Sequence, residues 1–292
     1  MPSGIILKGI GGFYYVKTSN AVYECRARGI FRKDDHSPLP GDRVGITVLD
    51  EDKKTGTIDE ILPRESHLVR PAVANVNQLA VVLAVKSPSP DFMLVDKLLI
   101  TARLKELDVV ICVNKMDLDE NGECKNIRAA YEQAGYPCIQ LSSKFDIGFD
   151  ILKHKLQGKI TVFAGQSGVG KSTILNKIMN SWIMKTGDIS GKIERGRHTT
   201  RHAELVELES GGYVVDTPGF SSLELTGIKS SELDTFYPEF NDRRLHCKFI
   251  GCSHISEPGC SVKEALEAGL IDRGRYLRYI EFYNALKQRR EY

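Results

Sequence analysis

Short apolar runs dominate the first 66 residues. Turns rich in glycine or charge separate these runs, as at residues 9–12 and 50–56. This pattern predicts five strands, at residues 5–8, 13–17, 22–27, 43–49 and 57–61. Several short strands at this spacing are typical of a small all-β barrel of the OB type.

From about residue 76 the pattern changes to continuous apolar runs that alternate with segments of helical spacing. The apolar runs occupy residues 79–85, 109–113, 138–141 and 160–163, and the helical segments occupy residues 94–104, 126–133 and 173–179. Runs that are apolar at every position are typical of strands buried on both faces, as in a parallel sheet with helices between its strands. We therefore predict an α/β domain after the barrel.

Two boundaries divide the chain into three predicted domains. Pro63 and Pro71 bracket a segment that we interpret as a linker, and a short region rich in cysteine and histidine begins near residue 226. The predicted domains are an OB-fold RNA-binding domain at 1–66, an α/β domain at 67–225 and a small zinc-binding domain with helices at 226–292. In the last domain, residues 261–264 have the form of a capping box, and Gly269 suits the end of that helix.

Composition excludes several classes of protein. Of the 292 residues, 41% are hydrophobic and 27% are charged, which supports a buried core and excludes a disordered chain. No apolar run approaches the roughly 20 residues that span a bilayer, and the first residues lack the basic and apolar segments of a secretory signal. We expect a cytoplasmic protein with no membrane partner, and nothing in the sequence requires more than a monomer.

The net charge of +2 conceals local basic clusters. They lie in the barrel, in the segment before residue 202, beside Cys247 and in the last predicted helix: Arg26, Arg28, Arg32 and Lys33; Lys192, Arg195, Arg197 and Arg201; Arg243, Arg244 and Lys248; Arg275, Arg278, Lys287, Arg289 and Arg290. Clusters in several regions suit contacts with RNA phosphates, although each one alone also fits a solvated surface. The last helix also carries apolar residues at helical spacing, which we expect to pack inward: Tyr276, Ile280, Tyr283 and Leu286.

A phosphate-binding loop is predicted between the apolar run at 160–163 and the helical segment at 173–179. Residues 165–172 match the pattern G-x-x-x-x-G-K-[ST] in the strand–loop–helix context that it needs. Glycines let backbone N–H groups turn toward phosphate oxygens, and the helix N-terminus adds positive potential. Lys171 would reach the β- and γ-phosphates, and the Ser172 hydroxyl would bind Mg²⁺. The predicted binding residues are Gly165, Gln166, Ser167, Gly168, Val169, Gly170, Lys171, Ser172 and Thr173. A glycine-rich turn without a ligand is the structural alternative.

Asn114-Lys115-Met116-Asp117 follows a predicted strand and resembles the N-K-x-D motif with which GTPases read guanine. The Asp117 carboxylate can accept hydrogen bonds from guanine N1–H and from the exocyclic amine. Adenine offers no such pair of donors and would leave the carboxylate unpaired. Asn114 would hold the loop together, and Lys115 would lie along the base. A helix cap after a strand is the alternative for an isolated motif of this kind.

Ser142-Ser143-Lys144 ends the predicted strand at 138–141. It resembles the S-A-K element whose backbone contacts guanine O6, with Ser143 in place of the small alanine. A contact through the backbone should tolerate that change. Ordinary turn chemistry is the alternative.

Asp216-Thr217-Pro218-Gly219 follows an apolar run at 213–215 and matches the D-x-x-G pattern. Asp216 would hold Mg²⁺ through water, and the Gly219 N–H would face the γ-phosphate. A second match at 119–122 is interpreted as accidental, because it precedes the phosphate loop. Between the loop and Asp216, Thr200 is preferred to Thr199 as a contact for Mg²⁺ and the γ-phosphate, with a solvated basic loop as the alternative.

The motifs occur in an unusual order. The base-reading motifs at 114 and 142 precede the phosphate loop at 165, whereas they follow it in ordinary small GTPases. In a parallel α/β sheet the ligand-binding loops lie at the carboxyl ends of the strands, and cutting the chain elsewhere keeps those ends together. We therefore predict a circularly permuted P-loop GTPase domain at 67–225.

Three cysteines and one histidine lie close together in the C-terminal region. Cys247, Cys252, His254 and Cys260 fit a closed Cys₃His site for one Zn²⁺, which is structural because no position is left for water. His246 is a less suitable ligand because it is adjacent to Cys247. Reduced cysteines in a small core are the alternative. The remaining cysteines are dispersed and are expected to be structural: Cys25, Cys112, Cys124 and Cys138.

In combination and in this order, the motifs resemble the ribosome-small-subunit-dependent GTPases of the RsgA (YjeQ/YloQ) type, which are circularly permuted. The resemblance rests on residues 114–117, 165–173, 196–201 and 216–219 and on the cysteine and histidine spacing, and it covers essentially the whole chain. It implies an N-terminal OB domain and a C-terminal zinc domain. It also implies hydrolysis of GTP to GDP and phosphate with Mg²⁺, stimulated by the small (30S) ribosomal subunit, with 16S rRNA contact and a role in late subunit maturation.

One position departs from the pattern of Ras-like GTPases. Phe220 stands where a water-orienting glutamine would be expected, so we expect slow hydrolysis unless the ribosome brings His198 or another group to the water. Two other function classes remain open. A non-catalytic RNA-binding adaptor is disfavoured by Lys171 and Ser172, and a P-loop ATPase or kinase is disfavoured by Asp117.

Overall fold

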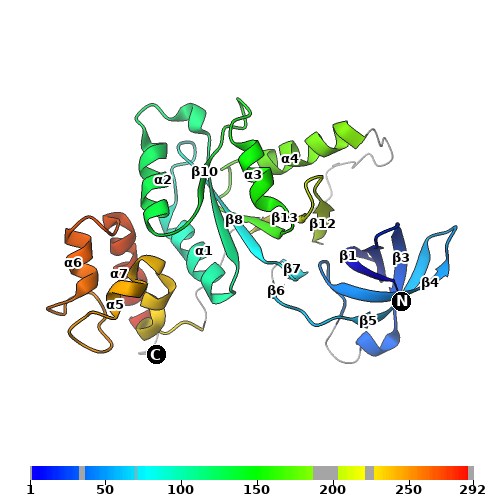
Figure 1. Ribbon diagram of the computed structural model, residues 1–292, viewed down its shortest axis with the longest axis horizontal. Coiled ribbons are helices and arrows are strands. Elements are labelled where there is room, and N and C mark those ends of the chain that lie inside the picture. Colours follow the sequence, from blue (N-terminus) through cyan, green and yellow to red (C-terminus); the bar gives the residue numbers. More distant parts are fainter. Residues whose placement is uncertain (1, 33–36, 70, 187–202, 221–226, 289–292) are drawn as a thin grey trace. The chain divides into compact units, whose positions relative to one another are not determined.

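The computed structural model describes residues 2–32, 37–69, 71–186, 203–220 and 227–288 (Figure 1). The chain divides into two compact units. Unit 1 comprises residues 1–78, 152–163 and 174–220, and unit 2 comprises residues 79–151, 164–173 and 221–292. Among the described helices, none is both long enough and apolar enough to cross a membrane.

Five strands of unit 1 close into a barrel. They are β1 (Ser3–Ile10), β2 (Phe13–Lys17), β3 (Val22–Ala27), β4 (Arg43–Asp50) and β5 (Thr55–Ile61), and the 3₁₀ helix η1 (Gly29–Arg32) follows β3. The strand order is β1-β2-β3-β5-β4, and only the β3–β5 pair is parallel. Alternate apolar side chains fill the interior: Ile6, Val16, Tyr23, Cys25, Val44, Ile46 and Ile58. The predicted all-β barrel is confirmed.

A hairpin follows the barrel where the sequence indicated a linker. Its strands are β6 (His67–Val69) and β7 (Ala72–Ala74). After β7, Asn75 donates from Nδ2 to the Gly41 carbonyl at 2.9 Å. Before β6, the Arg64 guanidinium pairs with the fully buried Asp42 carboxylate at 2.7 Å. The segment interpreted as a linker thus contains a hairpin, and side chains on both sides of it are bound to the loop before β4.

Two lysines of the barrel are paired with glutamates of a short strand, β12 (Glu204–Glu207), within the same unit. Lys8 Nζ lies 2.9 Å from Glu204 Oε1, and Lys17 Nζ lies 3.0 Å from Glu207 Oε2. All four side chains are about one third to one half exposed. The barrel is therefore joined to β12 by ion pairs that water can reach.

A six-stranded sheet has the order β10-β9-β8-β11-β13-β12. Its other strands are β8 (Gln78–Ala84), β9 (Asp108–Asn114), β10 (Cys138–Gln140), β11 (Ile160–Ala164) and β13 (Tyr213–Phe220). β8 and β11 are buried along their whole length, as strands inside an α/β sheet should be. β9 and β10 are parallel, and β12 and β13 are antiparallel. The predicted α/β architecture is confirmed, and the four apolar runs match strands to within one residue at each end.

Helices connect the strands of this sheet. They are α1 (Phe92–Leu104), α2 (Glu123–Gln133), α3 (Phe149–Leu156), α4 (Lys171–Thr186) and the 3₁₀ helix η2 (Met116–Leu118). Asp91 caps α1, since its carboxylate accepts a hydrogen bond from the Leu94 N–H at 2.9 Å. The sequence predicted α1, α2 and α4. The sequence did not predict α3, because two helical turns are too short to show a clear period. It also did not predict β12, a strand of only four residues that begins and ends with glutamate.

Unit 2 ends in a group of short helices beside α1 (Figure 1). They are η3 (Ser230–Phe236), η4 (Pro238–Phe240), α5 (Asn241–Arg244), α6 (Ser261–Glu267) and α7 (Arg273–Gln288). Their core includes Leu233, Phe240 and Tyr279, together with Ile100 of α1. The apolar residues of α7 pack against this core as predicted: Tyr276, Ile280, Tyr283 and Leu286.

The capping box predicted at 261–264 does not form. α6 begins at Ser261, so Cys260 occupies the N-cap position. The Ser261 hydroxyl instead donates to the His246 carbonyl at 2.9 Å. Gly269, just beyond the helix, adopts a φ of +71°, a left-handed conformation that suits glycine at a helix end, as predicted.

A buried arginine joins α7 to α1 and η4. Arg275 is 1% exposed, and its guanidinium donates to Glu239 Oε1 at 2.6 Å and to Asp96 Oδ1 at 2.5 Å. The other oxygen of Asp96 accepts from Arg278 Nε at 2.5 Å, and Tyr131 of α2 donates to the same carboxylate at 3.2 Å. Nearby carboxylates raise the pKa of Arg275 well above its ordinary value, although burial opposes them. The C-terminal helices are therefore bound to the body of unit 2 by a charged network that excludes water.

This network corrects part of the predicted basic surface. Arg275 and Arg278 were grouped with the basic residues that could meet RNA, but both guanidiniums are engaged by Asp96. Near the first cysteine, Arg243 donates to the Glu239 carbonyl at 2.8 Å and Arg244 lies 3.4 Å from the Asp234 carboxylate. Arg275 is therefore removed from the predicted basic surface, whereas Arg243 and Arg244 each make an internal contact and remain partly exposed.

Arg275→Met should destabilise the protein strongly, because it leaves the buried Glu239 carboxylate without its cation and leaves Asp96 with Arg278 alone. We expect the free energy of unfolding to fall by about 3–5 kcal/mol, measured by urea denaturation. Arg273→Met is the matched control, since Arg273 is exposed on the same helix and its loss should cost no more than about 0.5 kcal/mol. Equal effects of the two substitutions would contradict the assigned role of Arg275.

Candidate nucleotide site and candidate metal centre

The loop after β11 has the backbone that a phosphate-binding loop requires. Gly165, Gly168 and Gly170 have φ values of +147°, +82° and +100°, which side chains other than hydrogen rarely allow. A Cβ on Gly165 would lie 2.0 Å from the Val82 carbonyl oxygen, so the loop begins in direct contact with β8. α4 starts at Lys171, and the next side chain, Ser172, is exposed at the first turn.

Lys171 folds back over this loop. Its Nζ donates to the carbonyls of Gly165 at 2.7 Å and Gln166 at 2.8 Å. Burial lowers the pKa of the Lys171 ammonium. A cation held against the mouth of a glycine loop supplies the positive charge that phosphate oxygens need.

Asn114 links the N-K-x-D segment to the loop. It ends β9, is 1% exposed, and donates from Nδ2 to the Val169 carbonyl at 2.9 Å. Ser143 Oγ lies 3.4 Å from Asn114 Oδ1. A Cβ on Gly170 would lie 2.4 Å from Asn114 Nδ2, so this glycine is required by the approach of the amide as well as by its φ. Two segments about fifty residues apart in sequence are thus packed against each other.

Lys115 makes a second link between the two segments. It adopts a left-handed φ of +62°, and its Nζ donates to the Gly168 carbonyl at 2.8 Å and to the Ser87 carbonyl. Ser87 follows β8, so this ammonium bridges three loops at the carboxyl ends of strands. Ser87 was not predicted as part of the site, because a residue that contributes only a backbone acceptor has no signature in its side-chain type.

Asp117 is oriented by the segment after β10. The buried Ser142 hydroxyl donates to Asp117 Oδ1 at 2.6 Å and accepts from the Phe145 N–H at 3.2 Å. Met116 N–H donates to the Leu141 carbonyl at 3.1 Å, which holds the two segments in register. The half-exposed Asp117 carboxylate is therefore fixed in position at the edge of the site. Lys144 lies farther out, with its Nζ 5.2 Å from the centre of the Phe145 ring.

Of the remaining predicted residues, Asp216 lies half-buried in β13 opposite Glu204, and Gly219 lies near the end of the same strand. β13 neighbours β11 in the sheet order. His198, Thr199 and Thr200 fall outside the described residues.

The competing D-x-x-G match at 119–122 has a structural explanation. The Asp119 carboxylate accepts the N–H groups of Glu123 and Cys124, each at 2.9 Å, at the start of α2. Hydrogen bonds from these amides, the one from Cys124 being the largest cause, lower the pKa of Asp119. It caps a helix, so its match to the motif is accidental, as the sequence analysis expected.

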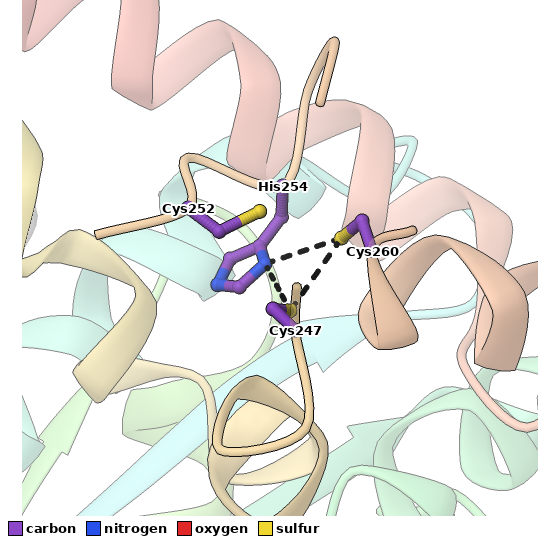
Figure 2. Close-up of side chains that lie close together, drawn as sticks. All are labelled: Cys247, Cys252, His254 and Cys260. Atoms are coloured by element: carbon purple, nitrogen blue, oxygen red, sulfur yellow. Dashed lines mark hydrogen bonds between the residues drawn. The ribbon is translucent and has the colours of Figure 1, made fainter. Parts of the chain in front are cut away.

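The predicted zinc ligands converge in unit 2 (Figure 2). Zn–S bonds of about 2.3 Å and Zn–N bonds of about 2.0–2.1 Å imply tetrahedral edges of roughly 3.8 Å between sulfurs and 3.5 Å between sulfur and nitrogen. The Cys247 and Cys260 sulfurs are 3.9 Å apart, and His254 Nδ1 lies 3.6 Å and 3.4 Å from them. All four ligand atoms, including that of Cys252, lie within 4.8 Å of one another. The group therefore fits a tetrahedral metal ion.

The loop that carries Cys252 and His254 is held by its neighbours. Tyr276 and Tyr279 of α7 donate to the carbonyls of His254 at 2.6 Å and Ser253 at 2.8 Å. Burial would raise the pKa of Glu257, but hydrogen bonds from Ser253 and nearby backbone N–H groups lower it to about 2. The alternative ligand His246 is exposed and does not belong to the group.

Burial raises the pKa of cysteine thiols both inside and outside this group. Burial raises the pKa of Cys252 to about 12, so in the absence of a cation this thiol stays protonated. Away from the group, burial raises the pKa of Cys25 to about 11 and of Cys112 and Cys138 to about 12. These thiols are poor nucleophiles and serve packing, as predicted.

Comparison with known proteins identifies relatives of the whole chain. Residues 3–58 match the family model for the RsgA N-terminal domain, and residues 61–226 match that for the RsgA GTPase. The small ribosomal subunit biogenesis GTPase RsgA of Ruminiclostridium cellulolyticum is 60% identical, over 100% of this chain and 96% of that protein. Its counterpart in Alkaliphilus metalliredigens is 49% identical over 100% of both chains.

Two solved structures are similar over nearly the same length. The crystal structure of YloQ, a circularly permuted GTPase, has a TM-score of 0.82 at 39% identity and covers 99% of this chain and 96% of that one. The crystal structure of YjeQ from Thermotoga maritima has a TM-score of 0.82 at 37% identity and covers 98% of each chain. The predicted fold class, with its permuted central domain, is confirmed.

Gly170→Ala should disrupt the contact between the phosphate loop and Asn114. Alanine is strained at the φ of residue 170, and its Cβ would displace the buried side-chain amide of Asn114. We therefore expect the free energy of unfolding to fall by about 2–4 kcal/mol. Gly269→Ala shares the left-handed φ but meets no atom within 4 Å, and should cost only about 1 kcal/mol. Urea denaturation gives both values, and NMR of the Asn114 side-chain amide reports the displacement directly. An unmoved amide signal in Gly170→Ala would contradict the geometry.

Proposed function

Because the chain belongs to the RsgA GTPase family, we propose that it binds GTP and hydrolyses it to GDP and phosphate on the small ribosomal subunit during late 30S maturation. The observation that supports this most strongly is the bond from Asn114 to Val169 together with the close approach of Gly170. It joins a base-reading segment to a phosphate-binding loop, and a guanine nucleotide is the ligand that needs both.

GTP would lie across the packed segments. Backbone N–H groups of residues 165–173 would surround the phosphates, with Lys171 turning from its loop carbonyls to the β- and γ-phosphates. Asp117, already oriented by Ser142, would accept from guanine N1–H and the exocyclic amine. Lys115 would lie along the base, and the backbone of residues 142–144 would face guanine O6.

Mg²⁺ would accompany the nucleotide. The exposed hydroxyl of Ser172 stands at the first turn of α4, the position that the motif gives to a magnesium ligand. Asp216 through water and Thr200 are the other proposed ligands, and the Gly219 N–H would face the γ-phosphate. The ion would neutralise charge that develops on the phosphate oxygens.

The attacking water needs a partner from elsewhere, because Phe220 has no group that can orient it. We assign this role to His198, brought to the site when the small subunit binds. The protein alone would then hydrolyse GTP slowly.

The C-terminal region would hold one structural Zn²⁺ through Cys247, Cys252, His254 and Cys260. The cation would bind the thiols as thiolates, which offsets the cost of burying their charge. It would also tie together a segment of short helices with a small core.

Contact with 16S rRNA is proposed for the barrel and for the exposed basic residues that unit 2 does not use internally. In the barrel, Arg26 lies over the Phe13 ring at 4.6 Å, which presents a cation and an aromatic face together. Arg28 is less available, because it pairs with Asp59 at 2.7 Å. The proposal includes domains at 1–66, 67–225 and 226–292, a monomer, and a cytoplasmic location alongside the ribosome.

Asp117→Asn should change the base preference. An asparagine cannot accept both guanine donors, so affinity for GDP should fall about 100-fold, or roughly 2.7 kcal/mol. Its amide can donate to the carbonyl that xanthine carries in place of the amine, so affinity for xanthosine diphosphate should rise. Fluorescent-nucleotide titration measures both. Asp119→Asn is the control and should leave the preference unchanged. If ATP competes better than GTP in the unaltered protein, the guanine assignment is wrong.

GTP hydrolysis should rise by at least about 100-fold when purified small subunits are added, because a missing catalytic group is supplied. Lys171→Ala should abolish the stimulated rate. His198→Ala should lose most of the stimulation and keep the slow basal rate. Full stimulation in His198→Ala would refute that residue's role, and no turnover at saturating subunits would favour a non-catalytic adaptor.

A further inference from the structure

The two ring nitrogens of His254 face different groups. Nδ1 lies 3.6 Å from the Cys247 sulfur and 3.4 Å from the Cys260 sulfur, inside the cluster of ligand atoms (Figure 2). Nε2 points the other way and lies 3.6 Å from Oδ2 of Asp234, a residue of η3 that is not part of the cluster. The ring is 1% exposed, so neither nitrogen is served by bulk water.

Binding of a metal through Nδ1 fixes the state of the other nitrogen. A neutral imidazole whose Nδ1 lone pair is donated to a cation carries its proton on Nε2. Nε2 has no hydrogen-bond partner within ordinary distance among the described residues. A buried N–H without a partner is destabilising. The carboxylate of Asp234 is the acceptor that faces it, slightly beyond hydrogen-bond length.

Asp234 is held in place by contacts of its backbone, its neighbour and its carboxylate. The preceding residue, Leu233, is fully buried in the C-terminal core, and the Tyr237 N–H donates to the Asp234 carbonyl at 3.2 Å. Arg244 Nη1 lies 3.4 Å from the same carboxylate oxygen that faces His254. A shift of only a few tenths of an ångström separates the present distance of 3.6 Å from a hydrogen bond to Nε2.

We propose that Asp234 is a positioning residue of the metal centre: its carboxylate accepts a hydrogen bond from the Nε2–H of His254 and so presents Nδ1 to the ion. A carboxylate behind a ligating histidine fixes the ring and increases its basicity as a ligand. This inference rests on the proposed Cys₃His metal site and adds a fifth residue to it. No sequence motif points to Asp234, since it precedes the first cysteine by thirteen residues and lies on another element.

The test measures metal affinity in the full-length chain. Unaltered protein and Asp234→Asn are loaded with Zn²⁺ and titrated with a chromogenic chelator. We expect one bound Zn²⁺ per chain in both, with affinity reduced about 10- to 100-fold in Asp234→Asn. If the unaltered protein binds no Zn²⁺, the proposed metal site fails. If it binds Zn²⁺ and Asp234→Asn matches it, only the role of Asp234 fails.

Two controls separate positioning from general stability. Arg244→Gln removes the other partner of Asp234 but keeps the carboxylate on His254, so it should retain most of the affinity. Asp242→Asn alters an exposed carboxylate on α5 and should have no effect. A loss in Arg244→Gln as large as in Asp234→Asn would overturn the proposal.

A spectroscopic measurement reports the tautomer itself. In zinc-loaded protein labelled with ¹⁵N on histidine, the His254 signals should show a protonated Nε2 and a metal-bound Nδ1. The Nε2 proton should exchange with water faster in Asp234→Asn than in the unaltered protein. A metal-bound Nε2, or an exchange rate that Asp234→Asn leaves unchanged, would refute the assignment.

Discussion

The arrangement of unit 2 depends on how one buried guanidinium is neutralised. Arg275 lies on the last helix, α7, and pairs with Asp96 of α1 and Glu239 of η4. Its guanidinium carbon lies 5.2 Å from the ring centres of both Tyr131 and Tyr237. A charge without water is tolerated only where its partners are held in place, so these elements must keep one mutual geometry. The C-terminal helices are consequently part of the body that carries the N-K-x-D segment. The loop with Cys252 and His254 is joined to that body through Tyr276 and Tyr279 of the same helix.

At the candidate nucleotide site a buried neutral group, the Asn114 amide, likewise needs a partner inside the protein. Asn114 is buried at the end of a strand and has to satisfy its amide inside the protein, which it does on the loop after β11. Only glycine at position 170 leaves room for that amide. The N-K-x-D segment and the loop after β11 are therefore held against each other by a contact within the protein itself.

Much of this could be predicted from sequence, because the signals were local. Continuous apolar runs marked β8, β9 and β11, and glycine spacing marked the phosphate loop. Prediction failed where a partner far along the chain decides the structure. Arg275 looks like a solvated basic residue until Asp96, 179 positions earlier, is placed beside it. The same holds for the hairpin at 67–74, whose flanking residues are held by residues 41 and 42, and for Asp234, which faces His254 from another element.

Because ion pairs connect the barrel to β12, the strength of this connection depends on the salt concentration. Lys8 and Lys17 meet Glu204 and Glu207 where water and counterions have access. At physiological ionic strength charges are screened over about 8 Å, and exposed pairs of this kind contribute at most about 1 kcal/mol each. How firmly the barrel is held on β12 therefore varies with salt. The barrel is therefore held more firmly on β12 in a dilute buffer than at cellular ionic strength.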